Sequence, residues 1–153
     1  MLYTVLIMDT NTNPAPAAEA MNAGTAAPAT KKVFIVEDDV FLGRVLSGQI
    51  REAKMDAQLF TMAEDALEAL KTTIPSIILM DIFLPGINGL DALEQIRKNE
   101  ATKHVPVLVV SNTDEAKDRD RAVSLGAEFM IKGASTPDDI VKHVADILED
   151  STQ

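Results

Sequence analysis

A run of four apolar residues that ends directly at a carboxylate constrains this chain more than any other feature. Residues 77–80 read Ile-Ile-Leu-Met, and Asp81 follows them. A continuous apolar run of this length, bounded by turn signals, is typical of a strand that is buried on both faces. A loop with two Gly and one Pro follows at residues 85–89. Asp81 is therefore predicted at the carboxyl end of a buried parallel strand, where open α/β folds place their chemistry.

Strand and helix patterns alternate five times over residues 31–150, which we expect to form one domain. This order predicts a doubly wound α/β fold, with a five-stranded parallel sheet and five helices on its two faces. The predicted strands cover residues 32–36, 57–60, 77–80, 105–110 and 129–131. The predicted helices cover residues 40–50, 61–70, 88–96, 114–125 and 136–150.

Capping signals stand at the ends of several predicted helices. Thr61-Met62-Ala63-Glu64 is a capping-box sequence, in which the threonine hydroxyl and the glutamate each satisfy a free amide of the first turn. Asp39 and Asn88 are predicted N-caps, and Thr136 with Pro137 opens the last helix. Gly126 is a natural stop for the helix that precedes it.

The first 30 residues differ in composition from the predicted domain. Residues 11–30 are rich in Ala, Pro, Asn and Thr, which favours a disordered extension. Residues 2–8 have the composition of a strand, and the alternative is that they add a strand to a sheet edge. Residues 151–153 are expected to be a short tail.

Composition excludes several classes of function. The net charge of −10 argues against non-specific binding to nucleic acid or to an anionic membrane. The chain has no cysteine, which excludes disulfides, thiolate zinc sites and a cysteine nucleophile. No apolar run approaches the roughly 20 residues of a spanning helix, and no signal peptide is evident. We expect a cytoplasmic protein without membrane contact.

Polar side chains follow four of the five predicted strands. Glu37 and Asp38 follow the first, Asp81 the third, Ser111 the fourth and Lys132 the fifth. Because the carboxyl ends of parallel strands share one edge, these side chains are expected to meet. Three carboxylates repel one another there, and Mg²⁺, which prefers oxygen ligands, relieves the repulsion. With a lysine and a hydroxyl to bind phosphoryl oxygens, the set indicates phosphoryl transfer to a carboxylate.

Each of these residues alone has an ordinary structural interpretation. A carboxylate after a strand is most often a turn or cap residue, and a single serine is more often a cap than a ligand. A single lysine is usually a solvated surface charge. The hypothesis of a phosphoryl-transfer site therefore depends on the combination of residues.

The same combination resembles the receiver domain of bacterial response regulators over residues 32–149. The resemblance implies a flavodoxin-like fold. The matching residues are Ile35-Val36-Glu37-Asp38-Asp39, Met80-Asp81 with Pro85 and Gly89, Val107-Leu108-Val109-Val110-Ser111, and Gly126-Ala127 with Phe129-Met130-Ile131-Lys132.

The resemblance implies a role for each acid. Asp81 is the nucleophile that accepts phosphate from the phosphohistidine of a histidine kinase or of a histidine phosphotransfer protein. Asp38 and Asp81 bind Mg²⁺ directly, together with the main-chain carbonyl of Phe83. Glu37 acts on the ion directly or through water.

The resemblance also implies a switch. Lys132 pairs with Asp81 and then with a phosphate oxygen, while Ser111 bonds the phosphate and moves toward it. Phe129, at the position of the switch aromatic, turns inward with Ser111. A new dianion thereby biases a two-state element at the surface of the fourth helix, fifth strand and fifth helix.

Three features depart from the family pattern. Gly133 replaces the usual proline, which makes a cis peptide bond much less favourable there. Asn112 replaces a small residue, and the segment between Ala127 and Phe129 is one residue shorter than usual. We expect these changes to affect the coupling of the site to the signalling surface more than phosphorylation.

Phe83 borders the path of an attacking water, so its bulk either slows hydrolysis of the acyl phosphate or serves partner contact.

The expected protein is a stand-alone receiver that signals by contact with an unidentified downstream protein. It is not an enzyme beyond its own magnesium-dependent phosphorylation and dephosphorylation. The alternatives are a phosphorelay intermediate and an interaction module that acts without phosphorylation. A phosphatase is disfavoured, because Phe83 stands where such enzymes place an acid–base aspartate. Val40 and Phe41 are either contacts for the phosphodonor or ordinary core residues.

Overall fold

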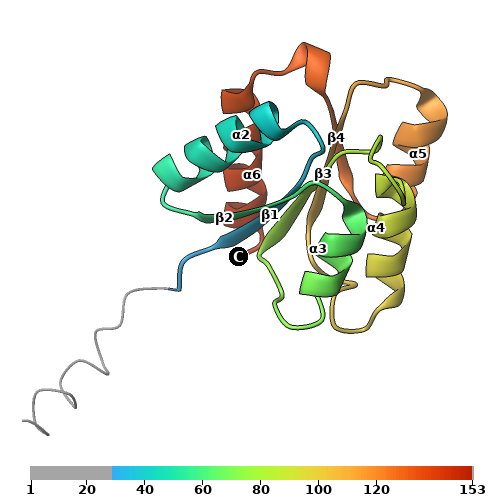
Figure 1. Cartoon of the computed structure of the whole chain (residues 1–153), viewed down its shortest axis with the longest axis horizontal. Coiled ribbons are helices and arrows are strands. Elements are labelled where there is room, and N and C mark those ends of the chain that lie inside the picture. The colour runs from blue at the N-terminus through green and yellow to red at the C-terminus, as the bar shows by residue number, and fades with distance from the viewer. Residues whose placement is uncertain (1–28, 153) are drawn as a thin grey trace, which may run out of the picture.

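The computed structural model describes residues 29–152 (Figure 1). The predicted extension, including the alternative strand at residues 2–8, lies outside these residues apart from its last two positions.

Five parallel strands form one sheet in the order β2-β1-β3-β4-β5. The sheet and the five helices around it confirm the predicted fold class. The strands are β1 (Lys32–Val36), β2 (Asp56–Phe60), β3 (Ile77–Met80), β4 (Val107–Ser111) and β5 (Glu128–Ile131). The helices are α2 (Val40–Glu52), α3 (Ala63–Ala69), α4 (Gly89–Lys98), α5 (Ala116–Ser124) and α6 (Pro137–Asp150), and a 3₁₀ turn, η1 (Lys132–Ala134), follows β5.

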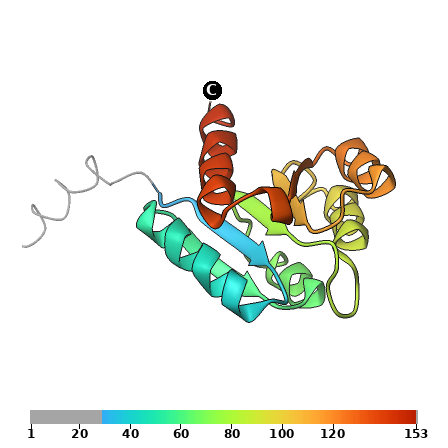
Figure 2. The ribbon, with the colours of Figure 1, turned by 90° about the horizontal axis from the view of Figure 1, so that it is seen from above.

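The sheet separates two apolar cores. Side chains alternate across a strand, so Val33 and Ile35 of β1 face one core while Phe34 and Val36 face the other. Helices α2 and α6 cover the first face, and α3, α4 and α5 cover the second (Figure 1). The turned view shows α2 and α6 apart from α4 and α5 (Figure 2). The continuous apolar run of β3 follows from burial on both faces.

Three of the predicted caps are present. The Asp39 carboxylate accepts a hydrogen bond from the Leu42 amide at 3.1 Å, and Asn88 caps α4 in the same way. Thr136 and Asp139 form a capping box at the start of α6. These short-range bonds fix where the helices begin relative to the strand ends.

The predicted capping box at residues 61–64 is wrong. Helix α3 begins at Ala63 with Met62 as its N-cap, and no side chain caps it. Glu64 is therefore the second helical residue rather than the third, so its carboxylate is not placed to bond back to the cap. Its Oε1 atom instead accepts a hydrogen bond from the amide of Ile87, 23 residues away, at 2.9 Å.

The first turn of α2 rules out one of the two interpretations of Val40 and Phe41, that of ordinary core residues. The side chain of Phe41 is 79% exposed and that of Val40 is 44% exposed, so neither is a core residue. The buried stripe of α2 runs through Gly43, Leu46 and Ile50. Phe41 precedes Gly43 by two residues, which places it about 200° around the helix from that stripe.

Helix α4 begins almost in contact with the end of β3. The Gly89 amide donates to the Ile82 carbonyl at 2.8 Å, and a Cβ atom on Gly89 would lie 1.9 Å from the Asp81 carbonyl oxygen. Only a residue without a side chain allows this approach. Gly89 thereby sets the position of α4 against the strand end that carries Asp81.

We predict opposite effects for alanine at two helical glycines. Gly89→Ala lowers the free energy of unfolding by about 1–3 kcal/mol, because the added methyl group overlaps backbone. Gly48→Ala raises it by about 0.5–1 kcal/mol, since a Cβ there meets no atom within 4 Å and alanine is the better helix former. Urea denaturation measures both variants, and a Gly89→Ala protein as stable as the wild type would contradict the close approach.

Candidate functional site

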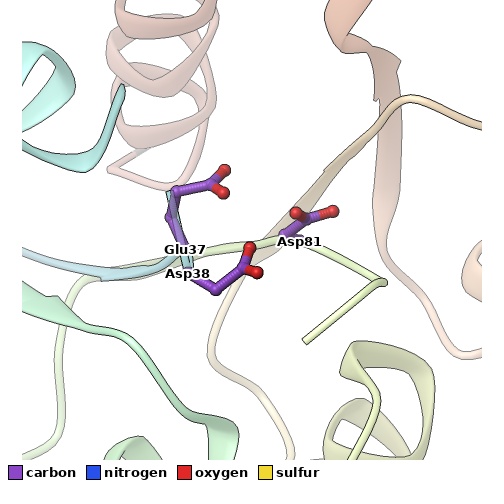
Figure 3. A group of neighbouring side chains, drawn as sticks. All are labelled: Glu37, Asp38 and Asp81. Carbon is purple, nitrogen blue, oxygen red and sulfur yellow. The ribbon is translucent and has the colours of Figure 1, made fainter. Parts of the chain in front are cut away.

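The register of the sheet brings the predicted site residues together at one edge. Val36 pairs with Met80, so Glu37 and Asp81 are the next residues of adjacent strands. Ser111 pairs with Ile131, so Lys132 begins one step beyond Ser111. Glu37, Asp81 and Ser111 are buried. Figure 3 shows the side chains of Glu37, Asp38 and Asp81 clustered where β1 and β3 end.

Lys132 joins two of the buried carboxylates. Its Nζ atom lies 2.8 Å from Oδ2 of Asp81 and 2.5 Å from Oε2 of Glu37. The remaining oxygen of each acid accepts a backbone amide, since Ile82 donates to Asp81 at 2.7 Å and Asp39 donates to Glu37 at 3.1 Å. Each carboxylate is thus held in place by two hydrogen bonds, one from Lys132 and one from a backbone amide.

The environment shifts the pKa of two members of this network. Burial raises the pKa of Glu37 above its usual value, although the hydrogen bonds from Lys132 and from the Asp39 amide oppose the shift. Burial also acts to lower the pKa of Lys132, but its hydrogen bonds to Asp81 and Glu37 outweigh burial and raise the pKa. Lys132 therefore stays cationic across the physiological range, and its charge compensates the buried acids.

The acid cluster has the donor set of a magnesium site. Carboxylate oxygens of Glu37, Asp38 and Asp81 lie within 4.8 Å of one another. Asp38 is exposed, unlike the two other acids. Mg²⁺ takes oxygen ligands and keeps several waters, so a cluster with one solvent-facing acid fits this ion.

Ser111 carries a hydroxyl with no protein partner. The residue is fully buried, and its Oγ atom makes no hydrogen bond to any of residues 29–152. A buried hydroxyl without a partner costs about 1–3 kcal/mol. An unpaired donor beside the Asp81 strand fits a bound group that has oxygen atoms, such as a phosphoryl group.

Phe129 lies half-buried in β5, against the core that α3, α4 and α5 cover. The guanidinium carbon of Arg119 in α5 lies 5.7 Å from the centre of its ring, in a cation–π arrangement. The guanidinium group therefore covers one face of the predicted switch aromatic. Asn112 is exposed, and Gly133 lies in η1 with no cis peptide bond anywhere in the described range.

Sequence reasoning missed the tertiary partners of the site. The sequence pattern predicts Glu64 as part of a helix cap, and it assigns no role to Arg119. Their actual contacts, Ile87 and Phe129, lie on other elements. No local pattern marks either pair.

Phe83 follows β3 in the loop before α4, and its side chain is 60% exposed, which is compatible with both roles considered for it.

The sequence model of the response regulator receiver domain family matches residues 33–145. The chain belongs to this family. BaeR, a transcriptional regulatory protein of Escherichia coli O6:H1, is 31% identical over 119 residues, which cover 78% of this chain and 48% of BaeR. PhoB, a phosphate regulon regulator of Rhizobium meliloti, is 24% identical over 108 residues, which cover 70% of this chain and 48% of PhoB. The receiver chain thus spans about half the length of these relatives.

Solved receiver structures share the fold. A CheY-like receiver domain from Methanospirillum hungatei superposes with a TM-score of 0.74 at 19% identity, covering 80% of this chain and 96% of that chain. A putative response regulator from Chloroflexus aurantiacus gives 0.72 at 24% identity, covering 79% and 99%. Receiver domains generally bind Mg²⁺ at an acidic pocket, and this structure has an acidic cluster at Asp81. Among residues 29–152, no helix combines the length and apolar character needed to cross a membrane.

We predict that Lys132→Met destabilises the receiver domain strongly at neutral pH. The substitution leaves Glu37 and Asp81 buried without a counter-charge, which costs about 3–5 kcal/mol. Burial already raises the pKa of Glu37, and loss of the lysine removes a group that opposes this rise, so the stability that depends on Glu37 is retained below its unfolded pKa and lost as pH rises through its folded pKa. Urea denaturation therefore shows a larger loss at about pH 8 than at about pH 5.

Lys103→Met is the matched control for this substitution. Lys103 pairs with Glu100 at 2.6 Å, but both side chains are largely exposed. Its loss changes the free energy of unfolding by at most about 1 kcal/mol. Equal effects of the two substitutions would show that the buried network contributes nothing special.

Proposed function

We propose that this receiver domain accepts a phosphoryl group on Asp81 from the phosphohistidine of a histidine kinase or of a histidine phosphotransfer protein. The observation that carries the proposal is the buried Asp81 carboxylate, hydrogen-bonded to Lys132, beside the unpaired hydroxyl of Ser111 on the neighbouring strand. The proposed nucleophile is thus bonded to a cation, and a free hydroxyl donor lies on the next strand.

The transfer exchanges one phosphorus bond for another. An oxygen of Asp81 attacks phosphorus, a new O–P bond forms and the P–N bond breaks. The imidazole nitrogen leaves with the electron pair of that bond. Lys132 then pairs with an oxygen of the phosphoryl group in place of the Asp81 oxygen, and Ser111 donates its hydroxyl to another.

Glu37, Asp38 and Asp81, with the main-chain carbonyl of Phe83, are the groups that would hold Mg²⁺. The ion supplies positive charge that offsets the charge of the transferring phosphoryl group. The chain's own contribution is to keep two acids fixed through Lys132 and backbone amides, while Asp38 remains exposed and free to adjust.

The signal leaves the site through β5 and its neighbouring helices. Ser111 and Phe129 lie on the adjacent strands β4 and β5, so movement of the hydroxyl toward a phosphoryl group opens space for the ring. Inward rotation of Phe129 separates it from Arg119 of α5. The proposed output surface is therefore the face formed by α5, β5 and α6, in contact with a downstream protein.

Exposed apolar side chains next to the acids suit contact with the phosphodonor. Phe41 follows Asp38 by three residues, and Phe83 follows Asp81 by two residues. Their exposed fractions of 79% and 60% are high for phenylalanine in a folded domain. Onward transfer of the phosphoryl group, as in a phosphorelay, would use the same contacts.

We predict one phosphoryl adduct on incubation with acetyl phosphate and Mg²⁺. Intact-mass spectrometry detects it in the wild type, where acetate replaces imidazole as the leaving group. Asp81→Asn abolishes it, and chelation of Mg²⁺ suppresses it. Asp65→Asn, which removes an exposed acid of α3, leaves it unchanged. An adduct on Asp81→Asn, or none on the wild type, would contradict the proposed acceptor.

We predict that Phe83→Asn shortens the lifetime of the acyl phosphate. A smaller polar side chain two residues after Asp81 admits water to the acyl phosphate more readily than the aromatic ring does. The decay of the adduct, followed by mass spectrometry after removal of acetyl phosphate, measures the rate. Phe41→Asn is the control, because Phe41 is also exposed but follows β1. Unchanged decay in Phe83→Asn would favour a role in partner contact instead.

A further inference from the structure

The loop that carries the proposed metal-binding carbonyl is tied to a helix on another part of the chain. This segment, the β3–α4 loop (residues 82–88), connects Asp81 to the start of α4. Its Ile87 amide donates to Oε1 of Glu64 at 2.9 Å. Within the described part of the chain, Glu64 is the one side chain from outside residues 81–88 that hydrogen-bonds the backbone of the loop.

The environment of Glu64 indicates a specific role. Its Oε2 atom is buried and has no partner among residues 29–152. A carboxylate withdrawn from water with only one oxygen bonded is costly, so its placement calls for a compensating function. The loop also closes tightly over it, since a Cβ on Gly86 would lie 2.1 Å from Oε1 of Glu64.

The backbone of the loop transmits this contact toward Phe83. Gly86 has a φ of +76°, a left-handed conformation that favours glycine, and the ring of Pro85 fixes its own φ. Few free rotations therefore separate Ile87 from Phe83. At the other end, the Leu84 amide donates to the Ile82 carbonyl at 3.1 Å. The backbone of Phe83 is thus restrained by the hydrogen bond between its two neighbours and by the bond that holds Ile87.

We propose that Glu64 is a positioning residue for Mg²⁺ binding, which acts by holding the β3–α4 loop in the shape that presents the Phe83 carbonyl. The inference depends on the proposed function, because it concerns the same site. Glu64 touches neither the phosphoryl group nor the ion; it sets the backbone that does.

Three variants of the full chain separate positioning from charge and from stability. Glu64→Ala removes the acceptor. Glu64→Gln keeps an acceptor oxygen for the Ile87 amide. Its NH₂ group replaces Oε2, which has no hydrogen-bond partner among residues 29–152, so no hydrogen bond is lost. Asp65→Ala removes an exposed charge from the same helical turn. Thermal denaturation establishes that each variant is folded.

The first readout needs no metal. In ¹⁵N-resolved hydrogen exchange, the Ile87 amide is protected in the wild type, Glu64→Gln and Asp65→Ala, and loses protection in Glu64→Ala. The second readout is the Mg²⁺ dissociation constant from calorimetric titration. Glu64→Ala weakens binding by about tenfold, as loss of an outer-shell partner does, while the two other variants stay within about twofold.

Several outcomes would overturn the inference. Unchanged Mg²⁺ affinity in a folded Glu64→Ala protein would show that Glu64 only stabilises the fold. Equal weakening in Glu64→Gln and Glu64→Ala would assign the effect to charge rather than to the hydrogen bond. Failure of the wild type to bind Mg²⁺ would overturn both the proposed function and this inference. The outcomes for the Glu64 variants, in contrast, overturn only this inference, so the two failures are distinguishable.

Discussion

The structure of this site depends on one buried cation between two buried acids. Lys132 lies within hydrogen-bonding distance of both Glu37 and Asp81, which come from adjacent strands and would repel each other without it. The network also joins β5 to β1 and β3, although β4 separates β5 from them in the sheet. An ion pair of this kind contributes less to stability than to specificity, because desolvation of the charges offsets much of their attraction. Its consequence here is an Asp81 carboxylate held in one orientation.

The sheet makes this network possible by aligning strand ends. Parallel strands buried on both faces require apolar residues along their whole length, so polar residues are first tolerated where a strand ends. Glu37, Asp81, Ser111 and Lys132 all occupy that position. The two cores keep the strands in register, and the close approach of α4 at Gly89 fixes the end of β3. Site geometry is therefore a consequence of register rather than of the loops alone.

Much of this arrangement could be predicted from the sequence, for physical reasons that differ between residues. Asp81 and Lys132 were predictable because strand ends share one edge in any parallel sheet. Asp39 was predictable because an N-cap bonds an amide three residues away. Glu64 was misassigned because the capping pattern at residues 61–64 is also compatible with a helix that begins later, and its true partner lies 23 residues on. The exposure of Phe41 and the contact of Arg119 with Phe129 depend on packing that no local period encodes.

The position of Lys132 directly after β5 has a consequence for the tolerance of the chain to insertions and deletions. Ser111 pairs with Ile131, so each residue of β5 has a fixed partner up to the lysine. Adding or removing one residue within β5 would turn the ammonium group to the opposite face of the sheet. A change of length before Glu128 can be accommodated, because Gly126, with a φ of +73°, turns the chain there after α5. A length change on the amino-terminal side of β5 therefore leaves the strand pairing and the position of Lys132 intact, whereas one within β5 moves Lys132 out of the site.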